Sequence, residues 1–143
     1  MLVSLGAVVG AVARYLLSEA TERMFGAGFP YGTLLVNVVG CLVIGIFGGW
    51  GIPDLSDTTR LLLITGLLGA LTTFSTFGWE SLELMQNGKV GVALANIGLN
   101  VVVSLVAVYG GYLIGQHFAR DYSPDIHYAI NRPELNWTSI FLR

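Results

Sequence analysis

Long apolar stretches alternate with short polar connectors along the whole chain. Four of these stretches come close to the roughly 20 residues that an α-helix needs to cross the hydrocarbon layer of a bilayer. They run over residues 2–18, 31–50, 60–85 and 90–118. Because the connectors are short, successive helices must run antiparallel, and four crossings leave both ends of the chain on one side. The pattern predicts an all-α membrane protein with four transmembrane helices.

Composition supports a membrane protein and excludes several other classes. Hydrophobic residues make up 54% of the 143 residues and charged residues 11%, whereas soluble domains carry about 25% charged residues. Isolated basic residues and a net charge of −2 do not form the basic patch that nucleic-acid binding requires. The single cysteine, Cys41, cannot form a disulfide within the chain. We expect one membrane domain over residues 1–118 and a C-terminal extension of unassigned role over residues 119–143.

The charges near the ends of the predicted spans do not favour one orientation in the membrane. Arg60 and Arg120 lie on the side of the chain ends, and Arg23 and Lys89 lie on the other side. Basic residues normally mark the cytoplasmic side, so this balance favours insertion in both orientations. Two oppositely inserted copies would then assemble as an antiparallel dimer around a two-fold axis in the membrane plane. The alternative is a single orientation set by the tail.

Glycines recur at a spacing that lets two membrane helices approach closely. The general frequency of glycine in membrane helices explains any one pair about as well. The three G-x-x-x-G pairs are Gly6/Gly10, Gly45/Gly49 and Gly111/Gly115.

Several polar residues lie inside the predicted spans, where an unsatisfied polar group is costly. Asn37 is either an interhelical hydrogen-bonding residue or a donor that lines a pore. Arg14 either draws anions toward a vestibule or extends to the membrane surface. Asn96, Asn100 and Ser104 follow one another at four-residue steps, so they share one face of the fourth helix. We favour a polar path over a purely structural contact for that face.

The third span contains the least regular stretch, "GLLGALTTFSTFGWE" at residues 66–80. Glycine and consecutive β-branched residues weaken a helix, which predicts a break in the middle of this span. Carbonyl groups freed at the break would suit a hard monovalent cation. Phe74 and Phe77 lie three residues apart, and aromatic ring edges carry partial positive charge that attracts an anion. The alternative is that both rings are ordinary apolar side chains that pack in the core or face lipid. The hydroxyl residues of the stretch are Thr72, Thr73, Ser75 and Thr76.

Residues that other functions would need are missing from the sequence. A small proton-coupled multidrug exporter would need an acidic residue within the first span, and Glu19 lies only at its edge. Glu80 and Glu83 lie toward the end of the third span. No Ser/His/Asp or Cys/His set is present for covalent catalysis, so we expect no enzyme. A non-transporting membrane scaffold would leave the F-S-T-F cluster unexplained.

Three motifs give the chain a resemblance to a known family. They are "GAVARY" at residues 10–15, "GTLLVNVVG" at residues 32–40 and the stretch at residues 66–80, of which the last is highly specific. Over residues 1–118 the chain resembles the Fluc/CrcB family of small four-helix fluoride channels. The resemblance implies a passive channel in the cell membrane, selective for fluoride over chloride. It also implies a homodimer of two oppositely oriented subunits in lipid, with two fluoride pathways.

The resemblance further assigns roles to individual residues. A structural sodium ion at the centre of the dimer would be held by main-chain oxygens of Gly69 and Thr72 from each subunit. Relatives often carry a tyrosine and hydroxyl residues on the fourth helix, where this chain has asparagines. The implied pore residues are Asn37, Phe74 and Phe77, with Arg14 near the vestibule and the hydroxyls of Ser75, Thr76 and Ser104 along the path.

Overall fold

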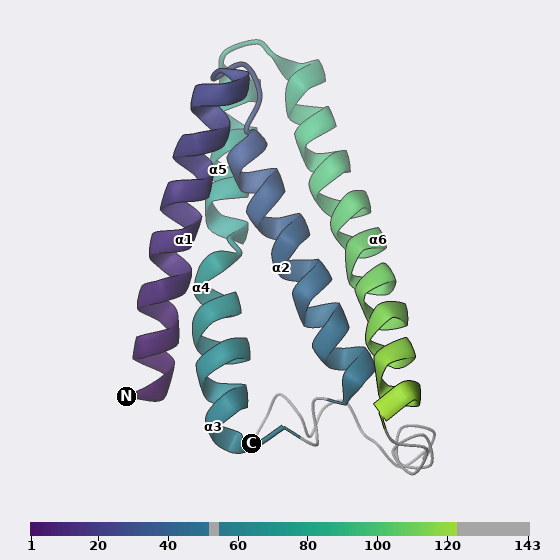
Figure 1. Ribbon diagram of the computed structural model, residues 1–143. Coiled ribbons are helices and arrows are strands. Elements are labelled where there is room, and N and C mark those ends of the chain that lie inside the picture. Colours follow the sequence, from purple (N-terminus) through teal and green to yellow (C-terminus); the bar gives the residue numbers. More distant parts are fainter. Residues whose placement is uncertain (52–54, 123–143) are drawn as a thin grey trace.

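The computed structural model describes residues 1–51 and 55–122, with the backbone alone for residues 120–122. The described chain is helical throughout apart from short connections (Figure 1). Its elements are α1 (Leu2–Phe25), α2 (Tyr31–Trp50), α3 (Asp57–Thr59), the π-helical segment η2 (Arg60–Leu68), α4 (Gly69–Leu71), α5 (Phe74–Gln86) and α6 (Val90–Tyr122).

Four helical segments of the described chain are long and apolar enough to cross a membrane, as the sequence predicts. The predicted bounds of the second are confirmed. The first continues to Phe25 instead of residue 18, because its polar last turns still form helix although they no longer resemble a membrane core. For the same reason α6 continues to Tyr122, so the extension predicted to begin at residue 119 starts inside this helix. Residues 123–143 lie outside the described part of the chain.

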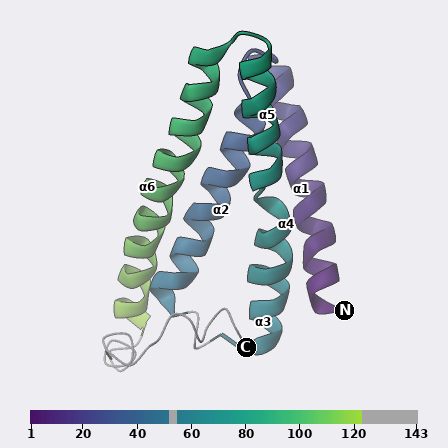
Figure 2. The same cartoon turned by 180° about the vertical axis from the view of Figure 1, so that it is seen from behind.

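The helices form two close pairs. α1 packs along η2 and α4, and α2 packs along α6. Figures 1 and 2 show the same arrangement from opposite sides, and in both views the bundle widens toward the end that holds Met1. The last described turn of α6 lies at this end as well, as antiparallel succession of the helices requires. The widening separates the pair α2–α6 from α3 and η2.

The α2–α6 pair is held together at the predicted glycines. A Cβ atom added to Gly45 would lie 2.2 Å from the carbonyl oxygen of Val108, and one added to Gly111 would lie 2.2 Å from that of Leu42. Gly49 and Gly115 continue the contact one turn further on. Backbones this close leave no room for any side chain, so the predicted role of these two glycine pairs as contact sites is confirmed.

The α1–η2 pair uses the remaining glycine pair. Added Cβ atoms would lie 2.0 Å from the carbonyl oxygen of Leu62 at Gly6, and 2.2 Å from that of Leu67 at Gly10. From the other side, a Cβ at Gly66 of η2 would lie 2.6 Å from a backbone oxygen of α1. The π-helical winding of η2 has no counterpart in the sequence prediction, which treated this stretch as ordinary helix. Such segments are rare and are enriched at functional sites.

Few side chains are fully buried in the described chain. Val36, Leu68 and Leu71 form the centre of the core, whereas large apolar side chains such as Val8 on α1 and Leu105 on α6 are exposed. A soluble protein rarely exposes so much continuous apolar surface. The outer faces of α1 and α6 therefore suit lipid.

Candidate functional site

The third span contains two residues that do not continue its helix. α4 ends at Leu71 and α5 begins at Phe74, and between them Thr72 (φ −77°, ψ 153°) and Thr73 (φ −150°, ψ 117°) are extended. The Thr72 N–H still donates to the carbonyl oxygen of Leu68 at 3.1 Å. The regular helix is thus interrupted for two residues near the middle of the span Asp57–Gln86.

Thr73 is the N-cap of the next helix, α5. Its hydroxyl oxygen accepts a hydrogen bond from the N–H of Thr76 at 3.2 Å, which is the usual way in which a threonine caps the first turn of a helix. The same hydroxyl donates to the hydroxyl of Thr76 at 3.0 Å and lies 3.4 Å from that of Ser75. Ser75 and Thr76, both expected along the pore, are exposed and line neither of the cavities described below.

Asn37 of α2 completes the interruption from across the bundle. The N–H of Thr73 donates to Asn37 Oδ1 at 2.8 Å, and Asn37 Nδ2 donates back to the Thr73 carbonyl oxygen at 3.3 Å. In a continuous helix the Thr73 N–H would instead donate to the carbonyl oxygen of Gly69. The Asn37 side chain therefore replaces one helical hydrogen bond of the third span.

A chain of buried side-chain hydrogen bonds continues from Asn37 through α6 to α5. Asn37 Nδ2 donates to Asn100 Oδ1 at 2.9 Å, and Asn100 Nδ2 donates to Asn96 Oδ1 at 2.8 Å. Asn96 Nδ2 then donates to the Ser81 hydroxyl at 2.9 Å, which donates to the Phe77 carbonyl oxygen at 2.8 Å. The side-chain amides of Asn37, Asn100 and Asn96 thus join three helices. Asn37 therefore forms interhelical hydrogen bonds, which was one of its two predicted roles. Its role in a pore stays a prediction.

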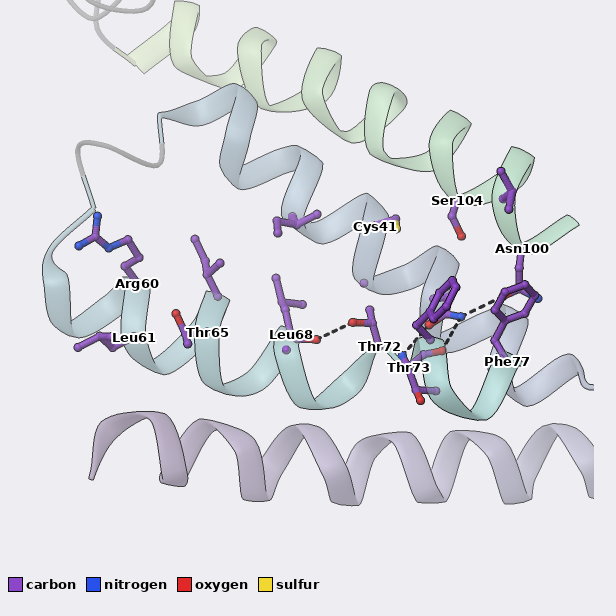
Figure 3. Close-up of a pocket in the computed structure, with 17 residues that line it drawn as sticks. Cys41, Arg60, Leu61, Thr65, Leu68, Thr72, Thr73, Phe77, Asn100 and Ser104 are labelled. Carbon is purple, nitrogen blue, oxygen red and sulfur yellow. Dashed lines mark hydrogen bonds between the residues drawn. The ribbon is translucent and has the colours of Figure 1, made fainter. Parts of the chain in front are cut away.

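A cavity of about 780 Å³ lies between α2, the third span and α6. Figure 3 shows it extending from Arg60 at one end to Phe77 and Asn100 at the other, with the Ser104 hydroxyl directed into it. The Ser104 Oγ is buried and has no hydrogen-bond partner among the described residues. This larger cavity therefore combines apolar walls with an unsatisfied hydroxyl.

The interruption forms one wall of the larger cavity. Gly69 and Thr72 both line it. A Cβ atom added to Gly69 would find its nearest neighbour at 3.8 Å, whereas one added to Gly40 of α2 would lie 2.2 Å from the methyl group of Thr72. Gly40 thus makes room for Thr72, but nothing within the described chain requires glycine at position 69.

The two phenylalanines of the interruption differ in their exposure. Phe77 is 7% exposed and Phe74 is 82% exposed, although both line the larger cavity. Their ring centroids lie 5.4 Å apart with the ring planes inclined by 60°. A large aromatic ring left so exposed inside a span must meet lipid or a second protein.

A smaller cavity of about 450 Å³ lies one helical turn further along α2 and α5. Thr33, four residues before Asn37, and Glu80, three residues after Phe77, both line it. The Thr33 hydroxyl donates to Glu80 Oε1 at 2.7 Å, and Glu80 Oε2 is buried without a hydrogen-bond partner among the described residues. The sequence interpretation assigned this pair no role, although its helical spacing from Asn37 and Phe77 gives a signal.

Arg14 lies apart from these residues. It is half-buried on α1, lines neither cavity and forms no ion pair within the described chain. The structure therefore brings Asn37, Phe74, Phe77 and Ser104 around one cavity with Gly69 and Thr72, but leaves Arg14, Ser75 and Thr76 outside it.

Four apolar spans with polar groups gathered around an interrupted helix define a multi-pass membrane protein with a polar site at membrane depth. Residues 1–112 match the family model described as CrcB-like protein, Camphor Resistance (CrcB). The chain belongs to this family.

Its relatives share most of their length with this chain. A protein of Clostridium novyi (strain NT) is 42% identical over 118 residues, which cover 81% of this chain and 92% of the relative. One of Shewanella halifaxensis (strain HAW-EB4) is 46% identical over 112 residues, covering 78% and 90%. One of Dehalococcoides mccartyi (strain CBDB1) is 43% identical over 117 residues, covering 80% and 90%. Each of the three is named "Fluoride-specific ion channel FluC".

Proposed function

We propose that the chain is the subunit of a passive, fluoride-selective channel and not an enzyme. The names of its relatives support the substrate. The observation that carries the proposal is the interruption at Thr72 and Thr73, which is bonded to Asn37 between two cavities. Polar backbone at membrane depth is tolerated where it lines a cavity or is buried in protein, and a channel needs such a place.

The residues around the interruption suit a small anion. Fluoride holds its water tightly, so a pore must offer hydrogen-bond donors and positive ring edges in exchange, and must still release the ion. Phe74 and Phe77 are adjacent, and Asn37 carries two N–H donors that are already used within the protein. We infer that a passing fluoride takes over one of these donors, which keeps its binding weak. The hydroxyls of Ser104, Ser75 and Thr76 and the charge of Arg14 belong to this proposal as additional groups along the path.

The channel is proposed to be a homodimer of two oppositely oriented subunits. Three observations support a second copy at the open face: the larger cavity, the exposed ring of Phe74 and the open space beside Gly69. The balance of basic residues between the two sides supports the opposite orientations. A partner would cover Phe74 and close the cavity into a narrower path.

The main-chain oxygens at the interruption fit a structural sodium ion. The Thr73 N–H donates to Asn37, so it is turned away from the Gly69 carbonyl that it would meet in a continuous helix. Hard cations prefer oxygen ligands, and unwound carbonyls provide them. We propose that Gly69 and Thr72 of both subunits hold the ion, which would supply positive charge near the anion path.

The proposed setting is the cell membrane, where a passive channel lets fluoride leave the cytoplasm. Hydrogen fluoride that enters an acidified cell dissociates at neutral pH, and the trapped anion then leaves through the channel. This role needs no energy source and no coupled proton. A proton-coupled exporter would instead move its substrate only with a proton gradient.

Fluoride efflux from liposomes that contain the purified protein tests the proposal, with a fluoride electrode as the readout. We expect fast fluoride release without a pH gradient and no chloride release under the same conditions. Phe77→Ala should lower the release while the dimer, measured by cross-linking, persists. Absent fluoride release, or equal chloride release, would refute the channel. If activity and assembly survive replacement of sodium by a large organic cation, the sodium site is wrong.

A further inference from the structure

The smaller cavity has charged side chains around it to which the proposed conduction path assigns no role. Glu22 of α1, Glu83 of α5 and Lys89 of the α5–α6 turn all line this cavity, and all three are exposed. They are more exposed to solvent than Thr33 and Glu80, which line the same cavity. An ion that passes between this cavity and Asn37 must cross their electric field.

The turn between α5 and α6 fixes the position of Lys89. The Lys89 N–H donates to the carbonyl oxygen of Leu84 at 2.9 Å, and the Asn87 N–H donates to that of Glu83 at 3.0 Å. Gly88 between them has φ +73°, a conformation that glycine adopts without strain. The backbone therefore holds the ammonium-bearing residue beside the last turn of α5.

No oppositely charged partner neutralises these three charges within the described part of the chain. The side chains of Glu22, Glu83 and Lys89 form no ion pair or hydrogen bond in the described part of the chain. The nearby ion pair on α1 joins Glu19 to Arg23 and leaves Glu22 free. Unpaired charges act on their surroundings at long range, limited by the salt concentration.

The helix ends around the cavity largely cancel each other. Tyr31–Thr33 is the first turn of α2 and carries a partial charge of about +0.5, whereas the last turn of α5 carries about −0.5. The balance at the cavity is therefore decided by the side chains. Two exposed carboxylates, together with the half-buried carboxylate of Glu80, oppose one ammonium group, which is an unfavourable balance for an anion.

We propose that Lys89, Glu83 and Glu22 set the rate at which fluoride enters the path from this cavity. Lys89 raises the local fluoride concentration, and the two carboxylates lower it. A unit charge about 10 Å from the ion in water changes its local concentration by about a factor of two. The inference rests on the proposed fluoride channel.

Fluoride currents of single channels in planar bilayers test the role of these charges. Ionic strength is set with the sodium salt of a large impermeant anion, at about 10 mM, where the screening length is about 30 Å, and at about 1 M, where it is about 3 Å. At low ionic strength we expect Lys89→Met to halve the current, and Glu83→Gln and Glu22→Gln each to raise it about twofold. At high ionic strength all three should match the wild type.

Charge-conserving variants separate electrostatics from structure. Lys89→Arg and Glu83→Asp should carry the wild-type current at both ionic strengths. The inference is wrong if Lys89→Met and Glu83→Gln change the current in the same direction, if neither changes it, or if their effects persist at high salt. In each of these cases the wild type still conducts fluoride and the proposed function stands. A wild type without fluoride current refutes the channel itself.

Discussion

Two glycine-containing surfaces of the subunit differ in what lies against them. Between α2 and α6 the four glycines of the two G-x-x-x-G pairs each face a backbone atom of the other helix. A Cβ atom added to Gly45 or to Gly111 would lie 2.2 Å from a carbonyl oxygen. On the cavity side of the third span, Gly69 faces open space, with its nearest neighbour at 3.8 Å. The first surface is complete within one chain. The second is open within the described chain, where the proposed partner subunit would lie.

In the proposed homodimer, this difference would separate residues that stabilise the subunit from residues that contact the partner. A glycine already packed against backbone cannot accept a methyl group without moving a helix. A glycine beside open space accepts the same methyl group and gains helix propensity, unless a second molecule occupies that space. Identical substitutions at the two surfaces should therefore damage different properties of the channel.

A large loss of stability is expected at Gly111. Gly111→Ala places a methyl group against the carbonyl oxygen of Leu42 and should destabilise the fold by about 1–3 kcal/mol. Gly110→Ala, one residue away on α6, meets nothing within 4 Å and should be neutral or stabilising by up to about 1 kcal/mol. Thermal unfolding in detergent measures both. Equal effects of the two substitutions would show that the α2–α6 contact does not limit stability.

A second matched pair examines the open surface. Gly66→Ala should destabilise the subunit by about 1–3 kcal/mol, because its new methyl group would lie 2.6 Å from a backbone oxygen of α1. Gly69→Ala should leave the stability of the subunit unchanged or slightly raised, but weaken dimer formation and its dependence on sodium. Unfolding of the monomer and cross-linking of the dimer report the two effects separately. A fully assembled, sodium-responsive Gly69→Ala dimer would contradict the proposed site.

Asn37 should show an effect on both stability and conduction. Asn37→Ala leaves the Thr73 N–H and the side-chain Oδ1 of Asn100 without the hydrogen bonds that Asn37 makes to them, at a cost of about 1–3 kcal/mol for a buried group. We expect fluoride efflux to fall about tenfold, as a barrier raised by about 1.4 kcal/mol implies. Unchanged efflux would remove Asn37 from the path.

A double-mutant cycle determines whether Asn37 and Asn100 act together. If the hydrogen bond between their side chains matters, the double alanine variant should lose less stability than the sum of the two single variants. Additive losses would mean that the two amides act independently, against the chain of hydrogen bonds seen in the structure.

The sequence predicted the spans better than the contacts of the polar residues. Apolar length located all four helices, because burial in lipid depends on composition along a short stretch. The ends of the helices were predicted less accurately, as at Phe25. A helix can continue past the residue at which the hydropathy of the sequence falls. The four-residue spacing placed Asn96 and Asn100 on one face, and the structure confirms that both turn inward.

Contacts between helices were beyond the reach of the sequence alone. The bond between Asn37 and Thr73 joins residues 36 positions apart, and the one between Thr33 and Glu80 joins residues 47 apart. Periodicity describes one helix at a time, so it could not tell that Thr73 caps α5 while Ser75 and Thr76 stay on the surface. The motif located the interruption, but three-dimensional packing decides which of its hydroxyls face a cavity.

A small change in stability is expected at Ser104, which lines the larger cavity. Its Oγ is buried in the larger cavity without a partner in the described chain, so Ser104→Ala removes an unsatisfied group and should leave stability unchanged or raise it by up to about 1 kcal/mol. If fluoride passes this hydroxyl, efflux should nevertheless fall, and Ser104→Thr should preserve it. Efflux equal to the wild type in Ser104→Ala would remove Ser104 from the path. A loss of stability would indicate a partner for the hydroxyl, which the proposed second subunit would provide.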